Sequence, residues 1–182
     1  PGVIHLKGIM PCGVITGEIF HLHNLEGHPE NSDRLRIALS GVPGRVRRLP
    51  PVPATLEEVE RVHRREYIQW LKGISKGECY LDHNTYICPE SFEVALHAAG
   101  SSVAAAEEAL DGCSCFAPVR PPGHHAEPAR ARGYCLLNNA AIAAKKVLAS
   151  ADRIAIVDWD LHHGNGTQEL FYTSDRVLFC SI

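Results

Sequence analysis

The sequence has no segment that could cross a membrane and no sign of a disulfide framework. None of its apolar runs approaches the ~20 residues that a helix needs to span a bilayer. It contains 7 cysteines, an odd number, and no two of them form a C-x-x-C pair. This pattern predicts an intracellular, reducing compartment, and it does not separate nucleus from cytoplasm.

A strong charge of either sign is also lacking. The chain has 18 basic and 21 acidic residues, for a net charge of -3. Such a balance indicates neither direct binding to nucleic acid nor attachment to a membrane surface. With 182 residues, of which 45% are hydrophobic, the chain has enough apolar material for one domain with a substantial core. No feature of the sequence indicates an oligomeric state.

Strands and helices are expected to alternate along the chain, which is typical of α/β proteins with a mostly parallel sheet. Thr55 and Glu58 have the spacing of a capping box, which marks the start of a helix. We expect helices over residues 31–39, 55–63, 67–74, 92–110, 136–148 and 167–172, and strands over 14–20, 115–119, 154–157 and 177–182.

Polar residues crowd together after the strand expected at 154–157. That strand is apolar without alternation, as in a strand buried on both faces of a parallel sheet. Asp158, Asp160, His162 and His163 follow it within six positions. Ligands of open α/β sheets bind at the carboxyl ends of the strands, so this turn is a candidate site.

Asp160 and His162 have a spacing that suits a metal ion. Residues i and i+2 of an extended segment point the same way, so one carboxylate and one imidazole can reach a single ion. This pair of ligands suits Zn²⁺, and also Mn²⁺ or Fe²⁺. The alternative is a solvated loop of ordinary polar side chains. The crowding of acids and histidines at a strand end favours the metal.

Two further histidines, His124 and His125, follow the strand expected at 115–119 after a rigid turn, Arg-Pro-Pro-Gly. If both strands belong to one parallel sheet, both polar turns project from the same edge and can share one pocket. The histidines between positions 21 and 28 lack acids at a matching spacing, so they are interpreted as structural.

Motifs over most of the chain resemble those of the zinc-dependent histone deacetylase family. They are the segments 27–30, 34–35, 85–89, 120–125, 133–135, 138–139 and 158–168. The resemblance implies a three-layer, arginase/deacetylase-like α/β fold with a mostly parallel central sheet. It also implies hydrolysis of acetyl-lysine amides in histones or other proteins. Asn165, with Thr167 and Gln168, resembles the class II and bacterial branch.

The resemblance assigns a role to each polar residue of the two turns except His163. Asp160 and His162 match two of three zinc ligands, and His124 and His125 match tandem catalytic histidines, with His125 as the general base. Asp158 matches the acid that orients the first histidine. Asp158 also matches, together with Ser181 and backbone carbonyls nearby, a structural potassium site.

Gly133 and Tyr134 match the wall of a narrow tunnel that holds the acyl-lysine chain in this family. The family more often has Phe where Tyr134 stands. A neighbouring loop departs from the family pattern because Asn84 replaces an acid, and we expect a weaker grip on the substrate backbone.

The family's third zinc ligand, an Asp, and its catalytic Tyr match no position of this chain. We therefore expect residues 1–182 to be an incomplete catalytic domain, truncated at the C-terminus, inactive alone and prone to aggregate. Two alternatives remain open: an acetylpolyamine or other small-amide hydrolase, and a non-catalytic relative that binds acyl-lysine. An arginase-like centre with two Mn²⁺ ions needs more acids, which Leu161 and Gly164 do not supply.

Overall fold

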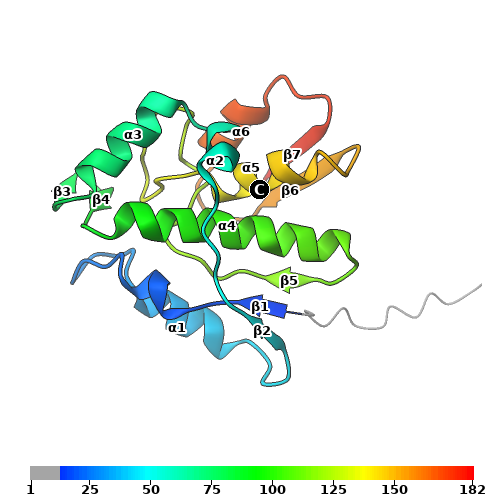
Figure 1. Cartoon of the computed structure of the whole chain (residues 1–182), viewed down its shortest axis with the longest axis horizontal. Helices are drawn as coiled ribbons and strands as arrows, with labels where there is room; N and C mark the ends of the chain where they lie inside the picture. The colour runs from blue at the N-terminus through cyan, green and yellow to red at the C-terminus, as the bar shows by residue number, and fades with distance from the viewer. Residues whose placement is uncertain (1–12) are drawn as a thin grey trace, which may run out of the picture.

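Residues 13–182 are described here from a computed structural model, and they form an α/β structure with parallel strands. Helix α4 (Ser91–Leu110) crosses the whole molecule in Figure 1. In that view β1 (Gly13–Ile15), β2 (Arg47–Leu49) and β5 (Cys115–Phe116) lie on one side of α4. The strands β6 (Ile154–Asp158) and β7 (Val177–Ser181) lie on the other side.

The parallel strands form two separate sheets. One has the order β2-β1-β5, and the other pairs β6 with β7 from Ile154 opposite Val177 to Asp158 opposite Ser181. Within residues 13–182 no ladder joins β5 to β6, so the expectation of one continuous sheet beneath both polar turns is wrong for this part of the molecule. An apolar groove of about 590 Å³, lined by Val119 and Ile156 among others, lies between the two sheets.

The remaining elements are short helices and one hairpin. They are η1 (Glu18–His21), α1 (Asp33–Ser40), α2 (Leu56–Glu60), α3 (Arg65–Ile74), the antiparallel pair β3 (Cys79–Tyr80) and β4 (Tyr86–Ile87), α5 (Asn139–Val147) and α6 (Asn165–Phe171). The expected helices occur with shifted ends. The capping box of α2 is confirmed, because Thr55 Oγ1 accepts from Glu58 N and Glu58 Oε2 accepts from Thr55 N.

Two expected strands are shorter than predicted. The first ends at Ile15, and a 3₁₀ helix replaces its second half, where Gly17 lies against the ring of Pro51. The strand expected over 115–119 pairs with β1 only at Cys115 and Phe116. In both segments apolar residues continue beyond the residues that pair with a neighbouring strand. A prediction from composition therefore overestimates the length of each strand.

The core lies around the contact of α4 with α5, where small residues allow close packing. Ala95 and Ala99 of α4 and Ala141 of α5 are fully buried. Ala54 N donates to Leu96 O, so the segment before α2 lies directly against the backbone of α4. This helical layer supports both sheets.

Strand β6 is covered on one face only, which corrects the expectation of a strand buried on both. Ile154 and Ile156 pack against the core, whereas Ala155 and Val157 are exposed, Val157 to 51%. The neighbouring strand adds Leu178, 62% exposed, opposite Ala155. No layer within residues 13–182 covers this face. None of the helices in residues 13–182 has the length and apolarity needed to cross a bilayer.

Candidate functional site

A buried ion pair anchors the turn that carries the two adjacent histidines. Arg120 Nε donates to Glu30 Oε1 over 2.6 Å, and Arg120 Nη2 donates to Glu30 Oε2 over 2.7 Å. Arg120 Nη1 also donates to Phe20 O over 2.8 Å. Both charged groups are buried, and a bidentate pair of this kind fixes direction as well as distance. The entry to the histidine turn is thereby tied to a segment 90 residues earlier.

Backbone contacts then hold the two histidines in place. Thr167 N, in the first turn of α6, donates to His124 O over 3.1 Å, and Asn138 Nδ2 donates to Ala126 O over 3.2 Å. A Cβ at Gly166 would lie 2.3 Å from Ala126 O, so only glycine permits this approach of α6. Hydrogen bonds to the backbone on both sides of His125 thus hold the turn independently of the two imidazole rings.

His124 faces the acid at the end of β6. Its Nδ1 lies 2.8 Å from Asp158 Oδ2, and its Nε2 points toward Asp160 Oδ1 at 3.9 Å. A carboxylate accepts hydrogen bonds, so Nδ1 carries the proton in this contact. Gly164 allows the pairing, since a Cβ there would lie 2.3 Å from Asp158 Oδ2.

His125 faces an amide instead of an acid. Its Nδ1 lies 2.7 Å from Asn165 Oδ1, and its ring centroid lies 4.0 Å from that of His124. Burial lowers the pKa of His125, the Asn165 contact raises it, and the neighbouring His124 and His162 lower it, with a net decrease. The ring is therefore neutral at pH 7 and has a nitrogen able to accept a proton.

Asp160 and His162 contact one another, as their spacing predicts. His162 N donates to Asp160 Oδ1 over 2.8 Å, and His162 Nδ1 lies 3.1 Å from the same oxygen. Burial alone would raise the pKa of Asp160, but the two hydrogen bonds from His162 and the nearby histidines outweigh it and lower the pKa. The carboxylate is ionised, and the ring of His162 lies 6.0 Å from that of His125.

This donor pair fits a zinc ion. Two ligands of one tetrahedral zinc ion stand roughly 3.3 Å apart when each bond is ~2.0 Å, close to the observed separation of 3.1 Å. Residues 13–182 hold no cluster of three or more histidine, cysteine, aspartate or glutamate side chains able to bind an ion. Asp160 and His162 can therefore supply part of a metal site.

Ser181 lies beside Asp158 in the β6–β7 ladder. Ile182 N donates to Asp158 O over 3.0 Å, which engages one of the carbonyls that the family resemblance assigns to a potassium site. A carbonyl oxygen has a second lone pair, so this bond leaves it able to contact a cation. The potassium site stays a prediction.

Gly133 and Tyr134 lie directly against the histidines and the hairpin loop. Gly133 has a φ of 56°, and a Cβ there would lie 2.3 Å from His125 Cδ2. Tyr134 N donates to Thr85 Oγ1 over 3.0 Å, and the Tyr134 ring meets His28 edge-on with centroids 5.2 Å apart. Gly133 thus borders His125, as a tunnel wall would, whereas the contacts of Tyr134 are with Thr85 and His28.

The loop before β4 is held by Asp82. Its Oδ1 accepts from Asn84 N over 2.9 Å and from Thr85 N over 2.7 Å. Burial would raise the pKa of Asp82, but the hydrogen bonds from Asn84 and Thr85 outweigh it and lower the pKa. The Asp82 carboxylate is therefore engaged by the backbone of its own loop. The neighbouring Asn84 side chain carries no charge.

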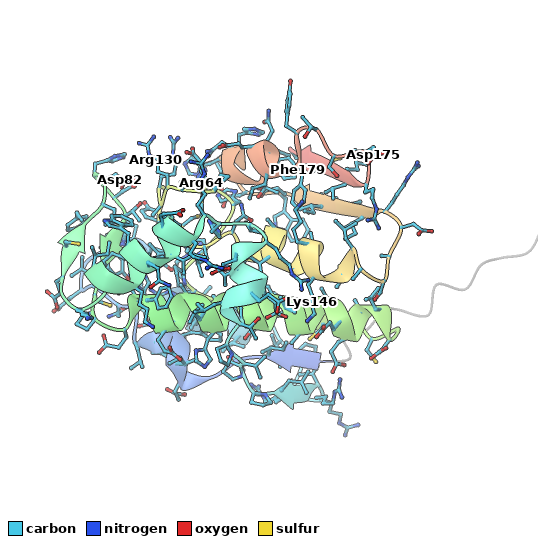
Figure 2. All side chains as sticks on the ribbon, turned by 45° about the horizontal axis from the view of Figure 1, so that its top comes forward. Arg64, Asp82, Arg130, Lys146, Asp175 and Phe179 are labelled. Carbon is cyan, nitrogen blue, oxygen red and sulfur yellow. The ribbon has the colours of Figure 1, made fainter. Side chains whose placement is uncertain are left out.

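One cavity of about 290 Å³ connects these features. It is lined by Asp82, His83, Asn84, His125, Arg130, Arg132, Gly133 and His162. Asp82 and Arg130, both labelled in Figure 2, lie at the same end of the molecule in that view. The cavity brings together a candidate base, His125, a candidate metal ligand, His162, and one residue of the expected tunnel wall, Gly133.

Other histidines have structural contacts. His23 is buried and stacked on Tyr86 with centroids 4.2 Å apart, and burial, then Arg120 and His28, lower its pKa to about 3. His163 Nε2 contacts Gln168 Oε1. The structural interpretation of the histidines near the N-terminus fits these contacts, although His23 and His28 are buried.

Sequence reasoning missed two residues around the site, His63 and Glu127, and also the contact of Asn165 with His125. Asn165 drew attention only through its resemblance to one branch of a family. Its contact with His125 spans 40 residues, and no local periodicity indicates such a pair. An acid two positions after His125 was a usable signal, because second contacts of active-site groups often come from carboxylates.

Residues 28–182 match the family model described as the histone deacetylase domain. The chain is 43% identical to histone deacetylase 8 of Arabidopsis thaliana, over 97% of this chain and 49% of that protein. It is 43% identical to a probable deacetylase of Archaeoglobus fulgidus, over 92% of this chain and 51% of that protein. It is also 38% identical to a histone deacetylase-like amidohydrolase of Pseudomonas aeruginosa, over 85% and 42% respectively.

A crystal structure of the HDA15 HD domain superimposes with a TM-score of 0.86 at 39% identity. The match covers 93% of this chain and 52% of that one. The likeness confirms the expected α/β fold of the deacetylase type. The chain spans about half the length of the relatives it matches.

Proposed function

The chain belongs to the histone deacetylase domain family, and from this premise we propose that it forms part of an enzyme that hydrolyses acetyl-lysine amides in proteins. One observation supports the proposal above others. His124, His125, Asp160 and His162, which come from two turns about 35 residues apart in sequence, converge on one place. Amide hydrolysis needs a base and a Lewis acid there. His125 can supply the base, and Asp160 and His162 can hold a metal ion that acts as the Lewis acid.

Asp160 and His162 would hold a zinc ion together with ligands from elsewhere in the whole protein. When bound, zinc supplies Lewis-acid chemistry, lowering the pKa of water to ~7 and polarising a carbonyl. Asp158 and Ser181, which are paired in the β6–β7 ladder, would contribute to a potassium site. These assignments rest on the donor chemistry of the residues and on the family.

His125 acts as the general base. Its Nδ1 proton faces Asn165, so its Nε2 has the lone pair that takes a proton from the attacking water. A positioned base of this kind contributes roughly 10²–10⁴ to the rate. His124, with its Nδ1 proton held by Asp158, lies beside it with the two ring planes tilted by 40°.

Residues 1–182 are proposed to be one part of the catalytic domain. The family's third zinc ligand and its catalytic tyrosine would come from the remainder of the protein, and residues 1–182 alone would be inactive. An intracellular, reducing compartment also stays a proposal, based on the cysteine pattern.

A second candidate substrate is a small acetylated amine. Asn84 stands where the family has an acid that grips the substrate backbone, and Asp82 is engaged in its own loop. A small amine has no peptide backbone to grip. This departure therefore favours it more than an acetylated protein.

The test is acetate release by the full-length protein from an acetyl-lysine peptide and from an acetylated diamine. We expect the peptide to be hydrolysed, His125→Ala to lower kcat at least ~10²-fold with unchanged zinc content, and Asp160→Ala and His162→Ala to abolish zinc binding. Faster turnover of the diamine would favour the second substrate. Activity of His125→Ala within tenfold of wild type would rule out His125 as the base.

A further inference from the structure

Behind Asn165 lies a carboxylate that the catalytic groups do not contact. Asn165 Nδ2 donates to Glu127 Oε1 over 3.0 Å, while Asn165 Oδ1 faces His125 Nδ1 at 2.7 Å. His125, Asn165 and Glu127 thus form a line of three side chains. Glu127 is largely buried, with 21% of its side chain exposed.

The carboxylate decides which way the Asn165 amide points. An ionised carboxylate only accepts hydrogen bonds, so the NH₂ group of Asn165 must face Glu127. The amide oxygen is then directed at His125, and an oxygen requires a proton on Nδ1. The lone pair of the ring is left on Nε2, which is the nitrogen that a general base needs free.

Without Glu127 the amide has no reason to prefer this direction. If the amide were reversed, its NH₂ group would face His125 and would favour the tautomer with the proton on Nε2. That tautomer cannot accept a proton from water at Nε2. The orientation of the Asn165 amide therefore determines whether the His125 ring can act as a base through Nε2.

We propose that Glu127 is a positioning residue that sets the orientation of the Asn165 amide and, through it, the tautomer of His125. Its consequence for catalysis rests on the proposed function. Its consequence for the tautomer does not, because that depends only on the three side chains.

The backbone of Glu127 is held independently of its side chain. Glu127 N donates to Arg130 O over 3.0 Å, and His63 Nδ1 lies 3.0 Å from Glu127 O. The side chain has one other partner, Arg132 Nη1 at 3.1 Å from Oε1. A substitution of the Glu127 side chain thus leaves the turn anchored, and Arg132 provides a control for the loss of that ion pair.

The first experiment reads the tautomer directly. Imidazole ¹⁵N shifts of His125 are recorded in the full-length protein, with zinc and metal-free, for wild type, Glu127→Ala and Arg132→Gln. We expect wild type and Arg132→Gln to have the proton on Nδ1 alone, and Glu127→Ala to populate both tautomers. A His125 that keeps Nδ1–H alone in Glu127→Ala would overturn the proposal, whether or not the protein deacetylates anything.

The second experiment uses a sign reversal. In wild type, Glu127→Gln weakens the preference of the Asn165 amide and should lower kcat ~10-fold with little change in KM, as is usual for residues behind the reacting groups. Asn165→Asp presents an acceptor oxygen in either orientation, but places its carboxylate against that of Glu127. In the Asn165→Asp background, Glu127→Gln supplies a hydrogen-bond donor to the new carboxylate at position 165. The double variant should therefore have a higher kcat than Asn165→Asp alone.

A role in holding the fold would lower activity in both backgrounds. Loss of kcat on adding Glu127→Gln to Asn165→Asp would therefore overturn the proposal. Gln and Glu have the same shape, and ¹⁵N spectra recorded for the Glu127→Gln and Asn165→Asp variants as well report whether each is folded. The comparison therefore isolates the direction of the hydrogen bonds. Absence of deacetylation by wild type itself would contradict the proposed function and leave the tautomer experiment decisive.

Discussion

At the scale of single residues, the histidines differ in what their Nδ1 atoms face. His124 faces a carboxylate, His125 an amide oxygen and His63 a backbone carbonyl. An amide oxygen carries no net charge, so little opposes the burial that lowers the pKa of His125. That ring is suited to begin a reaction cycle neutral, as a base must.

His63 makes stability depend on pH. Burial lowers its pKa from 6.5 to about 4, although backbone contacts at Glu127 and Pro128 raise it. Its Nε2 accepts from Asn138 N over 2.9 Å, a bond that only the neutral ring can make. The unfolded chain binds a proton below pH 6.5 and the folded chain does not, so stability is full above pH 6.5 and falls toward pH 4.

We expect this loss to be on the order of 3 kcal/mol for His63, since one pKa unit corresponds to about 1.4 kcal/mol. Urea unfolding of His63→Gln between pH 7 and pH 5 should show lower stability at pH 7 and a shallower decline. His21→Gln, at an exposed position, should keep the wild-type decline. Equal slopes in wild type and His63→Gln would contradict the assignment.

Some residues of the site could be predicted from the sequence and others could not. Asp160 and His162 follow from a two-residue spacing after a strand, and His124 and His125 from a turn after another. Asn165 could not be placed against His125, because their contact depends on how α6 packs on a turn 40 residues earlier. A local sequence pattern predicts which way side chains point within one element. A contact such as that of Asn165 with His125 depends instead on how two elements pack against each other.

At the scale of elements, α4 contains a glycine that its neighbour requires. A Cβ at Gly100 would lie 2.2 Å from Val52 O and 2.3 Å from Ala54 N, which are backbone atoms that cannot rotate away. Gly100→Ala should therefore destabilise the protein by about 2 kcal/mol or more, as overpacking does. In an open helix the same change usually stabilises, because alanine loses less entropy on folding.

Gly73 in α3 provides the matched control, since nothing lies within 4 Å of its Cβ position. Gly73→Ala should raise the free energy of unfolding by about 0.5–1 kcal/mol. Thermal and urea unfolding of both variants measure the contrast. If Gly100→Ala and Gly73→Ala both raised the free energy of unfolding, the segment before α2 would have moved away from α4 to make room for the new Cβ.

Helices were easier to predict than strands for a physical reason. A helix such as α4 satisfies its backbone within itself, so periodicity and end signals suffice to locate it. A strand ends where its partner ends, and β1 pairs over only three residues with β2. Apolar sequence beyond Ile15 gives no information about that partner.

At the scale of the whole molecule, we expect the exposed face of the β6–β7 sheet to promote self-association. Val157 and Leu178 are exposed there, and Trp159 and Leu161 beyond the strand are 83% and 93% exposed. A contiguous apolar surface with a strand edge favours pairing between copies. The isolated 182-residue polypeptide should therefore scatter light at concentrations where the full-length protein does not.

The substitution Leu178→Lys should reduce that scattering by placing a charge in the middle of the exposed face. Leu110→Lys makes the same chemical change at the end of α4, outside the β6–β7 sheet, where Leu110 is also exposed, and should leave scattering unchanged. Dynamic light scattering of the three polypeptides decides. If both variants and wild type aggregated equally, a surface other than the exposed face of the β6–β7 sheet would mediate the self-association.

The separation of the two sheets has a consequence for motion. His124 follows one sheet and Asp158 ends the other, and within residues 13–182 no ladder joins the two sheets. The turns meet instead through single hydrogen bonds, such as His124 Nδ1 with Asp158 Oδ2 and Thr167 N with His124 O. Units with few hydrogen bonds between them can open separately from global unfolding, with a free energy of their own. Amide hydrogen exchange in β6 and β7 would then report the rate at which the two turns part and the cluster of histidines comes apart.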